Sequence, residues 1–450
     1  MGARPAPWVP GGRKPLGPAG AARRGECARP RLPGRAAAAR RRSRLSSPSS
    51  ERQRQLIELA GSLADEFAGR AERYDRENSF PFENFDRLRE LRYTSLTVPE
   101  RYGGLGANLL EFCRAQERLA KGDGATALGV NMHLFGIGSL AERGDLAGEA
   151  ADRFFRPIVG GVIMGGGFSE PESGQNWASP SSVAVRTPGG YVLNGRKTFN
   201  SLAPIVGLFF VTARIEDPAD REPHVGFFVV LRGTPGLEIK ETWDTMGMRA
   251  TQSHDLLITD ARVAEQQLFS KWPTARRSPQ FSNMGVWFQL SVASVYIGIA
   301  AAALDYAVTF ANQRRPAALA NTIAHFPATQ FTAAEMLIEL EASRALVRGA
   351  ASDWLTRPEP ASEAEMAQEA SQWLVRSSIA KTFATDAAVR IVDRALEITG
   401  GVGLFRRFPL ERYYRDVRAG KVHPVSRALS LELIGKQTLG VPLDIEPRWG

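Results

Sequence analysis

The stretch MGGGFSEPESGQN at residues 164–176 is the first segment whose residue types could do chemistry. Glycines let a backbone approach a flat or anionic ligand closely, because they carry no side chain. Exposed turn amides and serine hydroxyls can donate hydrogen bonds to a pyrophosphate or to the carbonyl groups of a ring. Taken alone, the pattern also describes an ordinary structural turn.

Residues that bind metals are too few and too scattered to form a metal site. The chain has two cysteines, Cys27 and Cys113, and five histidines, and no group of them has the spacing of zinc ligands. We therefore expect no metal cofactor. The four histidines other than His423 occur in no pattern that distinguishes them from ordinary surface or core residues.

Apolar periodicity predicts helices in the first part of the chain. Leu59, Leu63 and Phe67 recur at steps of four, which places them on one face of a helix. We expect this helix to cover residues 51–75. The same periodicity predicts two further helices, at 85–91 and 109–121.

The pattern changes twice further along the chain. Between about residue 160 and residue 265, short runs of β-branched and aromatic residues are separated by Pro/Gly turns such as TPGG at 187–190, which is typical of antiparallel hairpins. After residue 280 helical patterns return, and their broad apolar faces favour a bundle. These patterns cover residues 284–313, 327–356 and 364–398.

The order helix, strand, helix predicts an α+β fold that is mainly α. We expect a tail at 1–50, an N-terminal helical domain at 51–158, a middle β domain at 159–270 and a C-terminal bundle at 271–442. The apolar run from Leu290 to Leu304 has about 15 residues, fewer than the roughly 20 that a membrane span needs. We expect a buried helix there and no membrane span.

Five segments occur in an order that resembles the acyl-CoA dehydrogenase family of flavoproteins. They are the glycine- and serine-rich stretch above, PERYGGLG at 99–106, NGRKTFNS at 194–201, WDTMGMRATQSHDLLITDARV at 243–263 and ITGGVGLFRRFPLERYYRDVRAG at 398–420. The resemblance covers residues 52–440. It implies an N-terminal helical domain, a middle β-barrel-like domain and a C-terminal four-helix bundle, with FAD held between the last two.

The resemblance also implies which residues contact the flavin. The family motif TEPGAGSD matches Ser169, Gly174 and Gln175, with Phe168 directly before them. Ser169 keeps a hydroxyl that can bond to the flavin ring. Gln175 keeps the polarity of the family residue but not its size.

Two further family motifs bear on the flavin. The Trp-Ile-Thr motif, which packs an aromatic ring on the flavin, matches Phe199, Asn200 and Ser201. Phenylalanine can replace tryptophan there, because stacking needs only a π face. Gly400 and Gly401 match a diglycine that approaches the pyrophosphate of a neighbouring subunit's FAD, and a helix C-cap would explain the same pair.

Arg315 is the nearest match to the family arginine that grips FAD from the neighbouring subunit, although the Phe-Gly that should follow it is absent. A homo-oligomer, a dimer or a tetramer, is therefore expected. Arg249 in MGMRAT is expected to contact the substrate or to orient a strand through an ion pair. The resemblance implies an acyl-CoA or carrier-bound acyl substrate and leaves the electron acceptor open.

The usual catalytic carboxylate of the family is missing. Oxidation of an acyl thioester removes a proton from the α carbon, and a Glu shortly after an Arg-Asp pair normally accepts it. Counted from Arg415 and Asp416, the family's Tyr-Glu pair falls on His423 and Pro424. The alternative location of this Glu falls near Phe288, and no acid lies there.

Two interpretations of the missing carboxylate follow. His423 could itself accept the α proton, because a neutral imidazole is a base near neutral pH. Alternatively, the chain could resemble the flavin-dependent monooxygenases of the same fold, which need no such base and for which FMN is the alternative cofactor. A flavin- or acyl-binding protein without efficient catalysis, with His423 only packing, is the third possibility.

The positive charge of the chain lies in its first 50 residues. The net charge is +9, and residues 1–50 hold 12 Lys and Arg against a single acid, Glu26, so the rest of the chain is nearly neutral. A nucleic-acid binder is therefore not expected. The segment has the low-complexity composition of a disordered tail. It fits a cytoplasmic protein with a solvated tail or a translated upstream stretch, or a mitochondrial matrix protein if the tail is a transit peptide.

Overall fold

The computed structural model describes residues 50–142, 146, 148–172, 179–274, 279–358 and 360–443. The prediction of a disordered tail falls on residues outside these ranges, except for Ser50. That residue is the N-cap of the first described helix, because its hydroxyl accepts a hydrogen bond from the Gln53 amide at 3.1 Å.

Helices make up the first part of the described chain. They are α2 (Glu51–Ala68), α3 (Ala71–Glu77), α4 (Phe82–Glu90), α5 (Leu109–Ala120), α6 (Gly124–Ala141) and α7 (Gly148–Val159). The single helix expected at 51–75 is wrong in one respect, since it breaks at Gly69 and Arg70 into α2 and α3. The sequence analysis missed α6, which is apolar on nearly every side and so shows no 3.6-residue periodicity.

Eight strands follow and form one sheet. They are β1 (Ile163–Gly167), β2 (Val183–Thr187), β3 (Gly190–Asn200), β4 (Val206–Glu216), β5 (His224–Leu231), β6 (Leu237–Lys240), β7 (His254–Ala264) and β8 (Leu268–Pro273). Their order is β6-β7-β3-β2-β4-β5-β8, and β1 pairs with β4 in parallel. The predicted hairpin around TPGG is confirmed, with Thr187 opposite Gly190.

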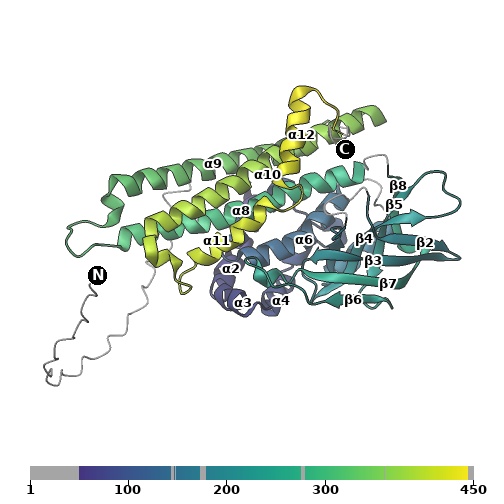
Figure 1. Ribbon diagram of the computed structural model, residues 1–450, viewed down its shortest axis with the longest axis horizontal. Coiled ribbons are helices and arrows are strands. Elements are labelled where there is room, and N and C mark those ends of the chain that lie inside the picture. Colours follow the sequence, from purple (N-terminus) through teal and green to yellow (C-terminus); the bar gives the residue numbers. More distant parts are fainter. Residues whose placement is uncertain are drawn as a thin grey trace, which may run out of the picture. The chain divides into compact units, whose positions relative to one another are not determined.

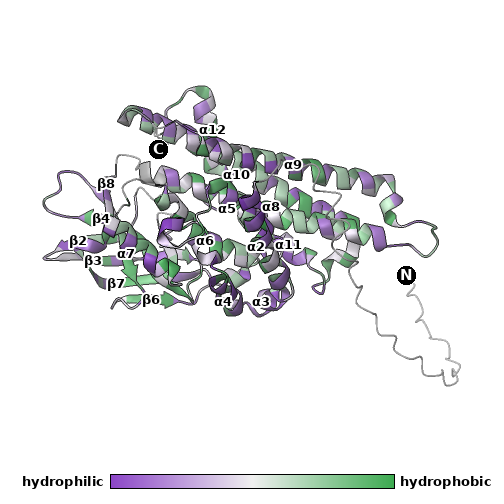
Figure 2. Ribbon diagram, turned by 180° about the vertical axis from the view of Figure 1, so that it is seen from behind, coloured by the Kyte–Doolittle hydropathy of each residue, from purple (hydrophilic) through white to green (hydrophobic). Residues whose placement is uncertain are grey.

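Long helices form the last part of the described chain. They are α8 (Pro279–Gln313), α9 (Pro327–Leu355), α10 (Glu363–Thr399), α11 (Leu410–Arg418) and α12 (Arg427–Leu439). The three longest, α8, α9 and α10, pack along one another (Figure 1). Seen from behind, α9 alternates between hydrophilic and hydrophobic residues along its length, as expected for a helix with one solvent-facing side (Figure 2).

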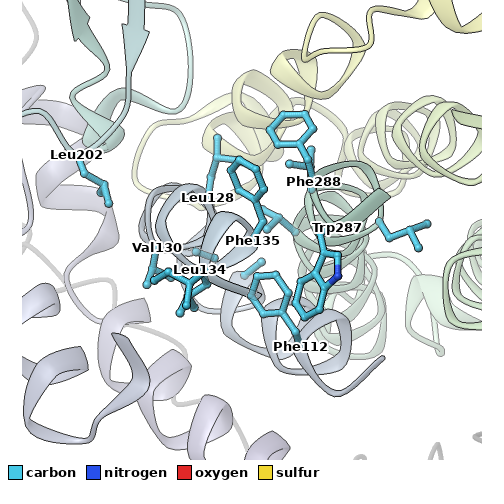
Figure 3. Close-up of a cluster of buried hydrophobic side chains, with 14 of the residues drawn as sticks. Phe112, Leu128, Val130, Leu134, Phe135, Leu202, Trp287 and Phe288 are labelled. Carbon is cyan, nitrogen blue, oxygen red and sulfur yellow. The ribbon is translucent and has the colours of Figure 1, made fainter. Parts of the chain in front are cut away.

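Helix α8 lies at the centre of the helical packing, against α5, α6, α9 and α10. Its segment Ser282–Gln313 is long and apolar enough to cross a membrane, but the whole apolar stretch is buried inside the protein. The prediction of a buried helix at Leu290–Leu304 is therefore confirmed. Rings from neighbouring helices meet across this core: Phe112 of α5 stacks on Trp287, and Phe135 of α6 packs edge-on against Phe288 (Figure 3).

The order of elements confirms the α, β, α organisation. Residues from Ser50 onward form one compact unit. The internal boundaries after residues 158 and 270 stay predictions, although α7 ends at Val159 and β1 begins at Ile163.

Candidate functional site

The glycines of the first motif serve packing in β1. A Cβ on Gly165 would lie 2.8 Å from a Val206 methyl carbon, and one on Gly166 would lie 2.4 Å from the Phe168 ring. Both distances are too short for a real side chain. These two glycines are therefore required by the close approach of β4 and Phe168, whether or not a ligand binds.

Phe168 does not present its ring as a free stacking surface. The ring is half-buried and stacks on Phe227, with centroids 5.7 Å apart. It also lines a narrow apolar cavity of about 10 Å³ together with residues of α6, β1, β4, β5 and α8, roughly the space that one water molecule occupies. Phe168 therefore forms part of the cavity wall, and its contact with the flavin stays a prediction.

Ser169 and Phe199 lie next to each other, as the resemblance implied. The Thr198 amide donates to the Ser169 carbonyl oxygen at 2.9 Å, so the residue after β1 is joined to the end of β3. Within the described residues the Ser169 hydroxyl makes no hydrogen bond. The Phe199 ring is 64% exposed and touches Trp243 edge-on at 6.0 Å, which leaves a face open for stacking.

A buried ion pair fixes the backbone around Ser169. Lys197 and Glu170 are both fully buried and bonded to each other. Glu170 also accepts hydrogen bonds from the amides of Ser181 and Ser182. Burial lowers the pKa of Lys197 to about 8, against the opposing charge of Glu170. The pair therefore joins the residue after Ser169 to β3 and to the residues directly before β2.

Ser201 belongs to a chain of three hydroxyls. Its oxygen lies 2.8 Å from that of Ser253, which lies 2.8 Å from that of Thr251. Thr251 donates its proton to the Met248 carbonyl oxygen at 2.9 Å. Because each hydroxyl has one proton, Ser253 must donate to Thr251, and Ser201 to Ser253. Ser201 is then left as an acceptor, which suits an N–H group of a ligand.

Asn200 points away from that ligand position. Its amide nitrogen donates to the carbonyl oxygens of Lys197 and His254, both at 3.0 Å, and so joins β3 to β7. Its side-chain oxygen is buried without a hydrogen-bond partner. The amide nitrogen of Asn200 therefore has a structural role, and a contact of this residue with a flavin stays a prediction.

The remaining residues expected at the cofactor lie elsewhere or cannot be placed. Gly174 and Gln175 lie outside the described residues. Arg315 is exposed after α8 and donates to the Leu319 carbonyl oxygen. Gly400 and Gly401 end α10, and Gly400 has a positive φ of 58° with open space around it. A C-cap explains this pair, and their contact with a flavin stays a prediction.

Arg249 forms hydrogen bonds that hold its own segment against α3. Its guanidinium donates to the carbonyl oxygens of Asp75 at 2.8 Å and of Thr245 at 2.7 Å. Next to it, the Met248 amide donates to Asp416 at 2.6 Å. These bonds support the orienting role that was one of the two expectations, and a substrate contact by Arg249 stays a prediction.

His423 lies between α8 and α10, where aromatic residues surround it. Its Nδ1 atom is 3.1 Å from the Tyr296 hydroxyl oxygen, and its ring centroid is 6.4 Å from that of Phe288. Phe288 in turn touches Phe135, which lines the apolar cavity. Burial, together with the positive charge of Lys381, lowers the pKa of His423 to about 3, so the imidazole is neutral at physiological pH.

The carboxylates of Asp416 on α11 and Asp305 on α8 bond to other groups. Pro424 replaces the family Glu. Asp416 accepts from the Met248 amide, and burial raises its pKa to about 7. Asp305 forms an ion pair with Lys121. Within the described part of the chain, no carboxylate is seen to contact His423, and no cluster of His, Cys, Asp and Glu could hold a metal ion.

Sequence reasoning missed several residues that build the site. His133 accepts a hydrogen bond from the Met164 amide and bonds to the Thr94 carbonyl oxygen, both at 2.9 Å, so it ties β1 to α6. Tyr296 and Lys381 flank His423. Tyr296 could have been noticed as a polar residue inside an apolar helix. Its partner, His423, lies 127 residues further along the chain, and no local pattern predicts that contact.

The described groups fit the ring system of a flavin. Phe199 offers an open aromatic face, the Ser169 hydroxyl is free within the described residues, and Ser201 offers an acceptor. These three features lie on the connected ends of β1 and β3. They match an apolar ring edged with carbonyl and N–H groups.

Comparisons with known proteins agree with this fit. Three family models match: the acyl-CoA dehydrogenase N-terminal domain at residues 50–149, its middle domain at 165–261 and its C-terminal domain at 290–427. YdbM of Bacillus subtilis (strain 168), provisionally named an acyl-CoA dehydrogenase, is 36% identical over 83% of this chain and 94% of its own length.

Two further proteins are similar to this chain over most of its length. The benzylmalonyl-CoA dehydrogenase of Aromatoleum aromaticum is 30% identical over 82% of this chain and 93% of its own length. The solved structure of KijD3 with FMN and a dTDP-amino-keto sugar is 28% identical, with a TM-score of 0.78 over 89% of this chain and 97% of that one. The chain therefore belongs to the acyl-CoA dehydrogenase family, has its three-domain fold, and is a flavin-dependent oxidoreductase.

Proposed function

We infer that the chain oxidises an acyl group carried on a thioester, with FAD as the hydride acceptor. The observation that carries this inference is the wholly apolar cavity that is lined in part by Phe168, the residue before Ser169. Its lining offers no charged or hydrogen-bonding side chain, so its chemistry suits an uncharged hydrocarbon group next to the expected flavin position. At about 10 Å³ the cavity must widen before an acyl chain fits. Relatives named dehydrogenases of CoA thioesters support the same substrate class.

The flavin supplies the two-electron acceptor that takes the hydride from the β carbon of the acyl group. The residues of this chain orient the reactants. Ser169, Phe199 and Ser201 would hold the ring, while Met132, Phe135 and other apolar residues would exclude water from the acyl group.

His423 is the group that would hold the α proton in this reaction. Its Nδ1 atom is engaged with Tyr296, so the Nε2 atom is the one left for a substrate. A base with a pKa of about 3 binds a proton weakly. The imidazole can therefore accept the α proton only if the bound acyl group and its surroundings raise that pKa.

Oxygenation of a substrate with reduced flavin and O₂ is the second candidate. One observation favours it: His423 is held neutral, and no carboxylate among the described residues is seen to contact it. Such a site is poorly equipped to remove a proton from carbon but can still hydrogen-bond to a substrate. The likeness to KijD3, whose structure holds FMN and an amino sugar derivative, supports this candidate.

The two candidates separate in one anaerobic experiment. The purified protein is loaded with FAD and titrated with acyl-CoAs of several chain lengths while the flavin absorbance band is followed. Bleaching without oxygen supports dehydrogenation. Absence of bleaching, combined with product formation only when reduced flavin and O₂ are both supplied, rejects dehydrogenation and supports oxygenation.

We also propose that the chain assembles with copies of itself. Large apolar side chains are exposed on the outer helices: Phe331 and Ile338 on α9 are 68% and 69% exposed, and Leu439 on α12 is 80% exposed. Such residues are typical of surfaces that another subunit covers. Sedimentation of the purified protein tests this, and a monomer at micromolar concentration would contradict it.

A further inference from the structure

A buried lysine supports the loop that carries His423. Lys381 lies on α10 and is 1% exposed. Its Nζ atom donates to the carbonyl oxygens of His423 at 2.9 Å and of Val425 at 3.0 Å. These two bonds hold the backbone on both sides of Pro424, at the position where the family carries its Glu.

The charge of Lys381 is costly where it lies. Among the described residues it makes no ion pair, because the carboxylate on the same helix, Asp386, bonds to Lys421 at 3.1 Å and to Arg427 at 2.9 Å. A buried cation held only by two carbonyl dipoles is expensive compared with an apolar side chain of similar size. Burial lowers the pKa of Lys381 to about 8. Stability alone therefore gives no reason for this residue.

The opposite side of His423 is equally constrained. Tyr296 of α8 is fully buried, and its hydroxyl meets Nδ1 of the imidazole. Phe288, on the same helix, lies against the ring edge-on. The imidazole is thus fixed through its backbone by Lys381 and through its ring by Tyr296.

We propose that Lys381 is a positioning residue for His423: it fixes the backbone at residues 423–425 so that the ring meets Tyr296. Its charge adds to the effect of burial in lowering the pKa of the imidazole. The assignment to a reacting group rests on the proposed function. Its structural part, the fixed imidazole, stands on the contacts alone.

The charged and titratable groups around this loop come from five elements. Tyr296 faces His423 from α8, and Asp416 of α11 acts on Tyr296. Asp386 on α10 attracts the Lys381 charge. Lys421, in the short helix before the loop, and Arg427 of α12 both neutralise Asp386. Lys381 is the charge that acts directly on His423.

Histidine NMR reads the protonation of His423 without any turnover. The chain has five histidines, so protein labelled with ¹³C and ¹⁵N in histidine gives few signals, and His423→Gln assigns the one of interest. In the wild type we expect His423 to stay neutral down to pH 4.5 and to show one predominant tautomer at pH 7, because the held backbone and the Tyr296 contact fix the ring in one environment.

Three variants separate the charge from the hydrogen bonds. Lys381→Met removes both, and we expect the His423 midpoint to rise by about one unit or more and both tautomers to appear. Lys381→Gln keeps an N–H donor without the charge, so the midpoint should rise while one tautomer persists. Lys240→Met removes an exposed lysine on β6 that pairs with Glu238 and should change neither signal.

An unchanged midpoint and tautomer in both Lys381 variants would overturn the proposal. If Lys381→Met does not fold, Lys381→Gln alone decides the role of the charge. A parallel pH profile of kcat/KM tests the link to catalysis: its acidic limb should move with the His423 midpoint. An NMR shift without a change in that limb would reject His423 as a reacting group while leaving the positioning role of Lys381 intact.

Discussion

The protonation of His423 restricts what this residue can do. With a pKa of about 3, the imidazole is neutral between pH 5 and 9. It is therefore not in the imidazolium form that could donate a proton as a general acid. Its Nδ1 atom is engaged by Tyr296, and one nitrogen is left to exchange a hydrogen bond or a proton with a ligand. Pro424 has no proton to exchange. The chemistry at this position therefore depends on one weakly basic nitrogen.

His423→Ala should lower turnover on acyl-CoA by about 10²–10⁴ if His423 accepts the α proton, and flavin binding should persist. Because the pKa lies near 3, the wild-type rate should be flat above about pH 5, with any rise below it. Steady-state rates from pH 5 to 9 check this. Normal activity of His423→Ala with both acyl-CoA and O₂ assays would show that His423 only packs.

Pro424→Glu is the matched gain-of-function variant. It places a carboxylate where the family has one, on a backbone already held by Lys381. If dehydrogenation is the reaction, acyl-CoA-dependent bleaching should become faster than in the wild type. If oxygenation is the reaction, bleaching should not appear, and His423→Ala should instead release hydrogen peroxide.

Flavin retention tests the residues at the ends of β1 and β3. Ser169→Ala removes one hydrogen bond, worth about 1 kcal/mol, and Phe199→Ala removes an exposed ring that can stack on the isoalloxazine. The double variant should lose FAD during gel filtration, whereas Phe331→Ala on α9 should retain it. Equal flavin content in the double variant and the wild type would mean that the motif register is wrong.

Elements that sequence patterns could identify are those with a clear period or clear turns. The long helices and the TPGG hairpin follow from such local signals. Helix α6 does not, because burial on all sides removes its periodicity. Ser169 and Phe199 could be paired through known motifs. The contacts of His423 could not, because Tyr296 and Lys381 lie 127 and 42 positions before it in the chain. Contacts of that kind depend on the tertiary packing of α8 and α10.

Gly247 shows how tightly the segment before η4 (Arg249–Thr251) packs on α11. A Cβ at Gly247 would lie 2.4 Å from the Arg415 carbonyl oxygen, which is backbone and cannot give way easily. Gly247→Ala should destabilise the protein by about 1–3 kcal/mol. Gly349→Ala in α9 has open space and should stabilise it by up to about 1 kcal/mol through helix propensity. Urea unfolding of both variants checks the pair, and equal midpoints would contradict the packing argument.

His133 makes the junction of β1 and α6 sensitive to acid. Burial lowers its pKa from 6.5 to about 4, so the unfolded chain binds more protons than the folded one between those values. Stability should therefore fall by up to about 3 kcal/mol as the pH falls from 6.5 to 4. His133→Gln, which does not titrate, should have a flatter pH dependence of its unfolding midpoint. Parallel curves for the two proteins would contradict this assignment.

At the scale of the whole molecule, the Arg415-Asp416 pair joins all three parts of the fold. Arg415 donates to the Asp75 carboxylate of α3 and to the Met246 carbonyl oxygen, and Asp416 accepts from the Met248 amide. N-terminal helices, middle domain and bundle therefore meet at one turn. This turn precedes His423 by seven residues, so the packing of the three parts also sets where the imidazole lies.

We expect the folded part of the chain to begin at Ser50. The first 49 residues have the composition of a segment that cannot bury a core, whereas Ser50 caps α2 through the Gln53 amide. Removing residues 1–49 while keeping Ser50 should leave the melting temperature and flavin content unchanged. Adding Ser50→Ala to the shortened chain should then cost about 1 kcal/mol, because the helix loses its cap. A fall of several degrees on truncation alone would show that the tail packs on the body and contributes to its stability.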